Sequence, residues 1–86
     1  MTDAGLAHRD QAERMAVAFC RVLRRAGLRV PITSTIGFVE ALGQVGLTDR
    51  QAVYWAGRST LVHRPEDLPL FDRVFAVFWR MFRSTW

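Results

Sequence analysis

The sequence predicts an all-α fold: a small, compact bundle of about four helices with a proline-led extra turn before the last helix. Apolar residues recur with the 3.6-residue period of an α-helix through most of the chain. Glycines follow the periodic segments, and the prolines stand at the breaks between them. A chain of 86 residues, half of them apolar, is expected to form one helical domain over residues 1–86.

The first helix is expected from about Arg9 to Ala26, after a flexible lead-in over residues 1–8. Asp10 and Arg14 have the i,i+4 spacing of a favourable ion pair. Gly27 suits the left-handed position that ends many helices. The expected buried stripe consists of Ala12, Met15, Ala16, Phe19, Val22, Leu23 and Ala26.

Two further helices are expected in the middle of the chain. The second covers about residues 35–45, is capped by Thr33 or Ser34, and ends at Gly46. The third begins with a capping box in which Thr48 is the N-cap and Gln51 reaches back. The expected buried stripe of the second helix is Ile36, Val39, Leu42 and Val45, and Trp55 of the third is expected in the core.

The last helix is the most apolar part of the chain. Pro65 is expected to open a short extra turn, and Pro69 to be the first residue of a helix over about 69–83. Apolar side chains cover roughly 200° of its wheel, whereas a surface helix needs only about 100°. The helix is therefore either central in the bundle or keeps a face for a partner. The candidate exposed apolar face is Leu70, Val77, Met81 and Trp79.

No chemistry of an enzyme or cofactor site is recognisable in the sequence. The glycines are isolated, and Cys20 with two distant histidines does not form a metal-binding pattern. The adjacent Glu66 and Asp67 are better explained as charges at a helix N-terminus than as general acid and base. We therefore expect no catalytic residue, no metal and no cofactor.

Charge, cysteine content and targeting signals indicate the possible partners and the cellular compartment. All twelve basic residues are arginine, and the net charge is +4, which allows an acidic partner, nucleic acid or only a solvated face. The complete absence of lysine suggests a GC-rich bacterial gene. A single cysteine fits a reducing cytoplasm, and neither a signal peptide nor a membrane-spanning segment is expected.

A nucleic-acid-binding helix-turn-helix is one alternative function. Arg50 and Arg58 would then lie on the reading helix. That helix carries Tyr54, Trp55 and Leu61 where polar side chains are needed, which disfavours nucleic acid. Self-association through the spare face of the last helix is a further alternative.

Two segments carry a family resemblance over roughly residues 17–80. FCRVLRRAGLRV at residues 19–30 and EALGQVGLTDRQAVYWAGRSTLVHRPEDLPLFDRVFAVFW at residues 40–79 resemble the N-terminal helical region of CoxE-like von Willebrand factor A (VWA) domain proteins. The most specific part is the run RPED…LFDR…FW. The Asp-x-Ser-x-Ser metal motif of the VWA domain does not occur here, and we expect an excised N-terminal domain.

The resemblance implies a non-enzymatic partner of MoxR-type AAA+ ATPases. Such pairs act in the maturation or remodelling of client enzymes, including metal-cofactor enzymes. The expected partners are the ATPase and either the protein's own VWA domain or a client protein. Arg64 and Asp67 could instead simply lock the turn. The candidate contact residues are Arg21, Arg24, Arg25, Arg58, Arg64, Glu66 and Asp67.

Overall fold

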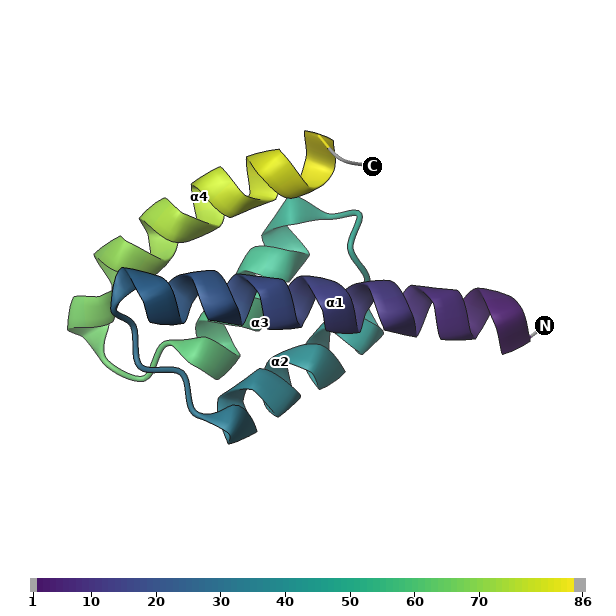
Figure 1. Cartoon of the computed structure of the whole chain (residues 1–86), viewed down its shortest axis with the longest axis horizontal. Coiled ribbons are helices and arrows are strands. Elements are labelled where there is room, and N and C mark those ends of the chain that lie inside the picture. The colour runs from purple at the N-terminus through teal and green to yellow at the C-terminus, as the bar shows by residue number, and fades with distance from the viewer. Residues whose placement is uncertain (1, 85–86) are drawn as a thin grey trace.

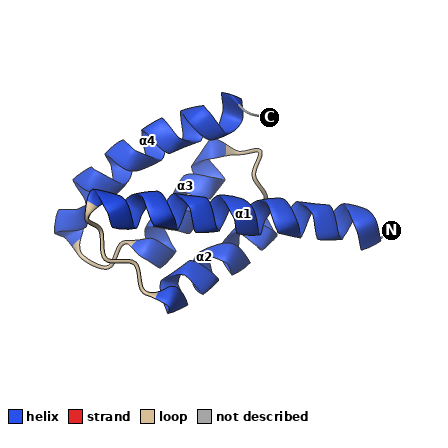
Figure 2. Ribbon diagram, viewed as in Figure 1, coloured by secondary structure: helices blue, strands red, loops and turns tan. Residues whose placement is uncertain are grey.

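The computed structural model of the chain describes the backbone of residues 2–84 and the side chains of residues 10–83. None of these residues forms a strand (Figure 2), so the all-α prediction is confirmed. In Figure 1, α1 runs across the bundle in front of α3, with α2 and α4 on opposite sides. The elements are α1 (Thr2–Ala26), α2 (Ile32–Val45), α3 (Arg50–Leu61), the 3₁₀ turn η1 (Pro65–Asp67) and α4 (Leu68–Ser84).

The two ends of α1 compare differently with the expectation. The helix begins at Thr2 instead of Arg9, so residues 2–8 are helical and do not form a separate lead-in. Its C-terminus is as predicted, because Gly27 has φ 109° and the amide of Leu28 donates to the carbonyl of Leu23 at 2.9 Å. This is the glycine-terminated helix end known as the Schellman motif. The predicted pair of Arg14 and Asp10 is also present, at 2.7 Å.

The expected N-cap of α2 is wrong, and its expected buried stripe is only partly right, because Leu42 is buried and Val39 packs against the core. The helix begins at Ile32 after Pro31, with no side-chain cap. Phe38 and Leu42 are its large buried side chains, whereas Ile36 is 51% exposed and Val45 is also exposed. Steps of three residues fall about 60° short of a full helical turn, so the expected stripe winds around the helix instead of following one face.

The third helix is capped one residue later than expected. Asp49, not Thr48, is the N-cap, and its Oδ1 accepts a hydrogen bond from the amide of Gln51 at 3.0 Å. Trp55 is 53% exposed, so its expected place in the core is wrong. The buried side of α3 is instead formed by small and aliphatic residues, namely Val53, Ala56, Gly57 and Leu61.

The core is centred on the ring of Phe19 in the middle of α1. Its centroid lies 5.9 Å from Phe38 of α2 and 5.7, 5.8 and 5.1 Å from Phe71, Phe75 and Phe78 of α4. Edge-to-face and tilted aromatic pairs at such distances are favourable beyond the area they bury. One residue of α1 therefore connects two helices that lie on opposite sides of it.

The connection from α3 to α4 is the proline-led turn that the sequence predicted. Pro65 is the first residue of η1, and the amide of Asp67 donates to the carbonyl of Arg64 at 3.0 Å. The main helix α4 follows at once, with Pro69 as its second residue. This corner determines the direction in which α4 returns past α1.

Candidate interaction surfaces

An apolar groove lies between α1 and α4, with a volume of about 550 Å³. Of the α4 residues, Val77 is 53% exposed and Met81 is 64% exposed. The inward side of the same helix is buried, through Phe71 and Phe75. The seven residues that line the groove are Val22, Arg73, Val74, Val77, Phe78, Met81 and Phe82.

The four residues expected on an exposed apolar face of α4 lie in different environments. Val77 and Met81 are exposed, and Leu70 is half-buried. Trp79 is only 8% exposed, so its assignment to this face is wrong. Its ring stacks on Phe75 at 6.0 Å, on the side of α4 away from Val77. Periodicity alone could not separate the two sides, because both are apolar.

Val22 is the groove residue that sequence reasoning misplaced on α1. It was expected in the buried stripe, but it is 41% exposed and lines the groove opposite α4. It lies at the edge of the apolar side of α1, and only the position of α4 decides whether such an edge is covered. A spare apolar residue at the edge of a stripe was the available signal.

The three candidate arginines of α1 differ in their contacts. Arg21 and Arg25 are exposed. Arg24 instead donates from Nε to the carbonyl of Val30 at 3.0 Å and from its guanidinium to Oγ1 of Thr35, also at 3.0 Å. Arg24 is also exposed, but it holds the connector and the start of α2 against α1.

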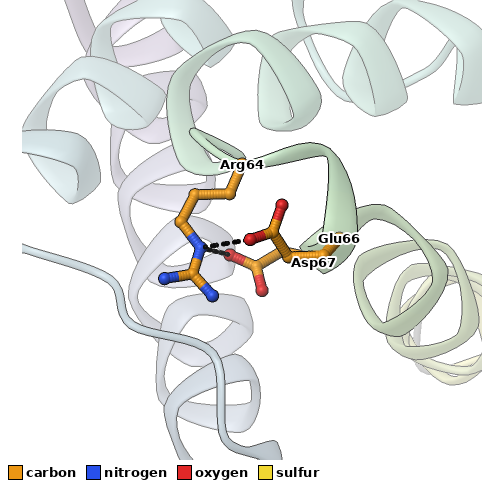
Figure 3. Close-up of polar contacts among 3 residues, drawn as sticks. All are labelled: Arg64, Glu66 and Asp67. Carbon is orange, nitrogen blue, oxygen red and sulfur yellow. Dashed lines mark ion pairs between the residues drawn. The ribbon is translucent and has the colours of Figure 1, made fainter.

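The corner between α3 and α4 carries three candidate residues that contact one another (Figure 3). Nε of Arg64 lies 3.2 Å from Oε2 of Glu66 and 3.8 Å from Oδ2 of Asp67. All three side chains keep part of their surface in solvent, so these pairs stabilise the turn by at most about 1 kcal/mol. Next to them, Ser34 Oγ and His63 Nε2 share a hydrogen bond of 2.9 Å, which ties the corner to α2.

A polar contact joins α3 to α4. The hydroxyl of Tyr54 donates to Oδ1 of Asp72 at 2.6 Å. This hydrogen bond is the main cause, and partial burial the second, of a pKa of Tyr54 that is raised above its usual value. Arg58 donates to the same hydroxyl at 3.5 Å, and its guanidinium lies 4.7 Å from the ring centroid of Trp55. Arg58 is therefore half-buried and engaged within α3.

A second, basic cleft of about 530 Å³ lies on another side of α4. Three arginines line it, Arg50 at the start of α3 and Arg80 and Arg83 on α4. The guanidinium of Arg50 lies 5.2 Å from the ring centroid of Phe75, which is a cation–π distance. The sequence placed Arg50 on a possible reading helix but did not bring it together with α4.

The described side chains offer little for chemistry. Cys20 is fully buried in the core, and this burial raises the pKa of its thiol, which makes it a poor nucleophile. Among residues whose side chains the structure describes, no three His, Cys, Asp or Glu groups come close enough to hold a metal ion. Over the same part of the chain, no helix combines the length and the hydropathy that a membrane span requires.

A family model described as the CoxE N-terminal helical bundle domain matches residues 16–81. The chain belongs to this family. The match covers the second half of α1, all of α2, α3 and η1, and most of α4, so it includes every lining residue of the groove in this CoxE N-terminal domain except Phe82. The family is a helical bundle and not a catalytic family. No curated protein and no solved structure matches the chain.

Proposed function

We propose that this CoxE N-terminal domain is a non-enzymatic protein-interaction domain that works with a MoxR-type AAA+ ATPase in the cytoplasm. Its task is the maturation or remodelling of a client enzyme, for which metal-cofactor enzymes are the first candidates. Besides the ATPase, its partners are a VWA domain or the client itself. Membership of the CoxE N-terminal family, which is a helical bundle domain, supports the non-enzymatic role in this proposal.

The observation that carries the proposal is the exposed apolar groove between α1 and α4. Apolar side chains that gather in one exposed groove, and are not scattered singly over the surface, often mark an interaction site. The helix that forms most of the groove also supplies Phe71 and Phe75 to the core. The groove is thus held on a rigid element, as a specific binding surface requires.

The direct test is binding of the purified chain to the MoxR-type ATPase encoded in the same gene neighbourhood. Interferometry without nucleotide, with ADP and with a non-hydrolysable ATP analogue should give saturable binding in at least one state. Met81→Glu should weaken it, whereas Ile36→Glu, at an apolar position on α2 that is also more than half exposed, should not. No binding in all three states would contradict the proposed ATPase partnership.

Nucleic-acid binding is the second candidate, and the cleft lined by Arg50, Arg80 and Arg83 is the observation that favours it. A protein that neutralises phosphates binds duplex DNA with a steep dependence on salt. Fluorescence anisotropy with a labelled duplex at low salt should then give a saturable curve that flattens as salt is added. A flat response at the lowest salt would remove this candidate.

A further inference from the structure

We propose that the groove between α1 and α4 binds an acidic amphipathic helix of a partner protein. The inference rests on the proposed function only in assuming that the domain binds proteins. It adds which surface is used and what chemistry the partner presents. Neither the identity of the ATPase nor that of the client enters the argument.

The dimensions of the groove fit a helix. Val74, Val77 and Met81 follow one another at i, i+3 and i+7 on α4, which spreads them over about 10 Å, or roughly two helical turns. The half-buried Phe78 and Phe82 also line the groove, and Val22 is the lining residue that α1 contributes. An elongated apolar trough of this kind receives the i, i+3, i+4 and i+7 anchors of an amphipathic helix.

The charge around the groove selects an acidic partner. Arg73 is the charged residue in the lining, and no carboxylate lines it. On α1, Arg21 precedes Val22 and Arg25 follows it by three residues, and both arginines are exposed. None of these three arginines forms a salt bridge with any side chain among residues 10–83. Acidic side chains beside the apolar anchors of a partner helix would therefore meet unpaired positive charge.

The same charge disfavours a second copy of the chain. In a two-fold symmetric dimer each groove would meet its own counterpart, so Arg73 would approach a like-charged rim. The open walls disfavour a small ligand, because Val77 and Met81 are more than half exposed and a drug-sized ligand is normally buried over most of its surface. A helix can cover these side chains from above.

The test uses two synthetic amphipathic peptides of about four turns with the same leucine spacing, one with glutamates and one with lysines on the flanks. Each is titrated into the full chain by fluorescence anisotropy at low salt, and amide chemical shifts locate the site. We expect the acidic peptide to bind about fivefold more tightly, since several exposed ion pairs can form and each contributes up to about that factor. The shifts should cluster on Val22 and on residues 73–82.

Two variants and their controls sharpen the result. Arg73→Glu should reduce the preference for the acidic peptide, whereas Arg29→Glu, in the connector away from the groove lining, should keep it. Met81→Glu should weaken binding of the acidic peptide at least about fivefold, and Ile36→Glu should leave it unchanged. All four positions are exposed, so the variants are expected to fold.

Several outcomes would overturn the inference. Equal affinity for the two peptides, or chemical-shift changes outside the groove, would contradict an acidic helix in the groove. A concentration-dependent dimer that buries Met81 would assign the groove to a second copy of the chain. Tighter binding of the fatty acid laurate than of the acidic peptide would assign the groove to a small apolar ligand. If the ATPase still binds both Met81→Glu and Arg73→Glu, the groove is not the binding surface, but the proposed function stands. If the acidic peptide binds in the groove but the ATPase does not bind at all, the groove assignment stands and the proposed ATPase partnership is refuted.

Discussion

Replacing Gly57 with alanine tests how tightly the aromatic core is packed. Gly57 is buried in the middle of α3, where it faces rings from two other helices. A Cβ atom at this position would lie 3.1 Å from Cζ of Phe71 and 3.4 Å from Cε1 of Phe38. The first distance is closer than carbon atoms normally approach, so the ring of Phe71 would have to move.

Two opposing contributions decide the sign of the change in the free energy of unfolding. Alanine in a helix interior is favoured over glycine by about 1 kcal/mol. Overpacking a filled core costs about 1–3 kcal/mol. Phe71 is fully buried, and its ring has neighbours on several sides, with centroids of Phe19, Tyr54 and Phe75 at 5.7, 5.6 and 6.0 Å. Because the ring has no free space to enter, we expect a net loss of about 1 kcal/mol.

The assay is thermal and urea unfolding followed by circular dichroism. A net loss of about 1 kcal/mol should lower the Tm by about 4–8 °C in a domain of this size. Gly43→Ala is the matched control, since Gly43 lies in α2 with open space around its Cα, and alanine there should stabilise by about 1 kcal/mol. If Gly57→Ala stabilises as much as Gly43→Ala, the core is looser than its ring contacts indicate.

Three further predictions concern single side chains. Arg24→Ala removes two internal hydrogen bonds and should lower the free energy of unfolding in urea by about 1–3 kcal/mol; Arg25→Ala should change it by less than about 0.5 kcal/mol, and equal losses would contradict the role of Arg24. Tyr54 is the only tyrosine, so tyrosinate absorbance should give a pKa above 10.0 that falls in Asp72→Ala. The fold favours the neutral hydroxyl of Tyr54, so its contribution to stability is complete below the unfolded pKa near 10 and is lost as the pH rises through the folded pKa. A free energy of unfolding that does not change with pH in this range would disprove this prediction. Cys20 should react with a disulfide reagent at least about 100-fold more slowly in the native chain than in urea, and comparable rates would mean that the core opens readily.

Local chemistry explains the features that were predictable from the sequence. Gly27 and Gly46 both have positive φ and end helices as expected, because only a residue without a Cβ adopts that backbone without strain. Pro65 opens the extra turn, since its missing N–H and fixed φ suit the first position of a helical turn. The ion pair of Asp10 and Arg14 depends only on the rise of one helix. The family was also recognisable from residues that are close in sequence.

The position of the groove was only partly predictable. An excess of apolar residues on α4 indicated a spare face, and Val77 and Met81 are exposed on it. Which apolar residues remain outside depends on where α1 and α3 lie beside α4. Trp79 is covered and Val22 is not, and neither outcome follows from the period of its own helix.

The sequence by itself determined the helical class, the places where helices end, and the presence of more apolar surface than the core needs. The tertiary structure decided the rotation of each helix about its axis, which put Phe38 inside and Trp55 outside. It also decided that Arg24, although exposed, donates hydrogen bonds to Val30 and Thr35 and so holds α2 against α1. Period and capping act within one segment, whereas burial and hydrogen bonding at these positions depend on atoms supplied by another helix.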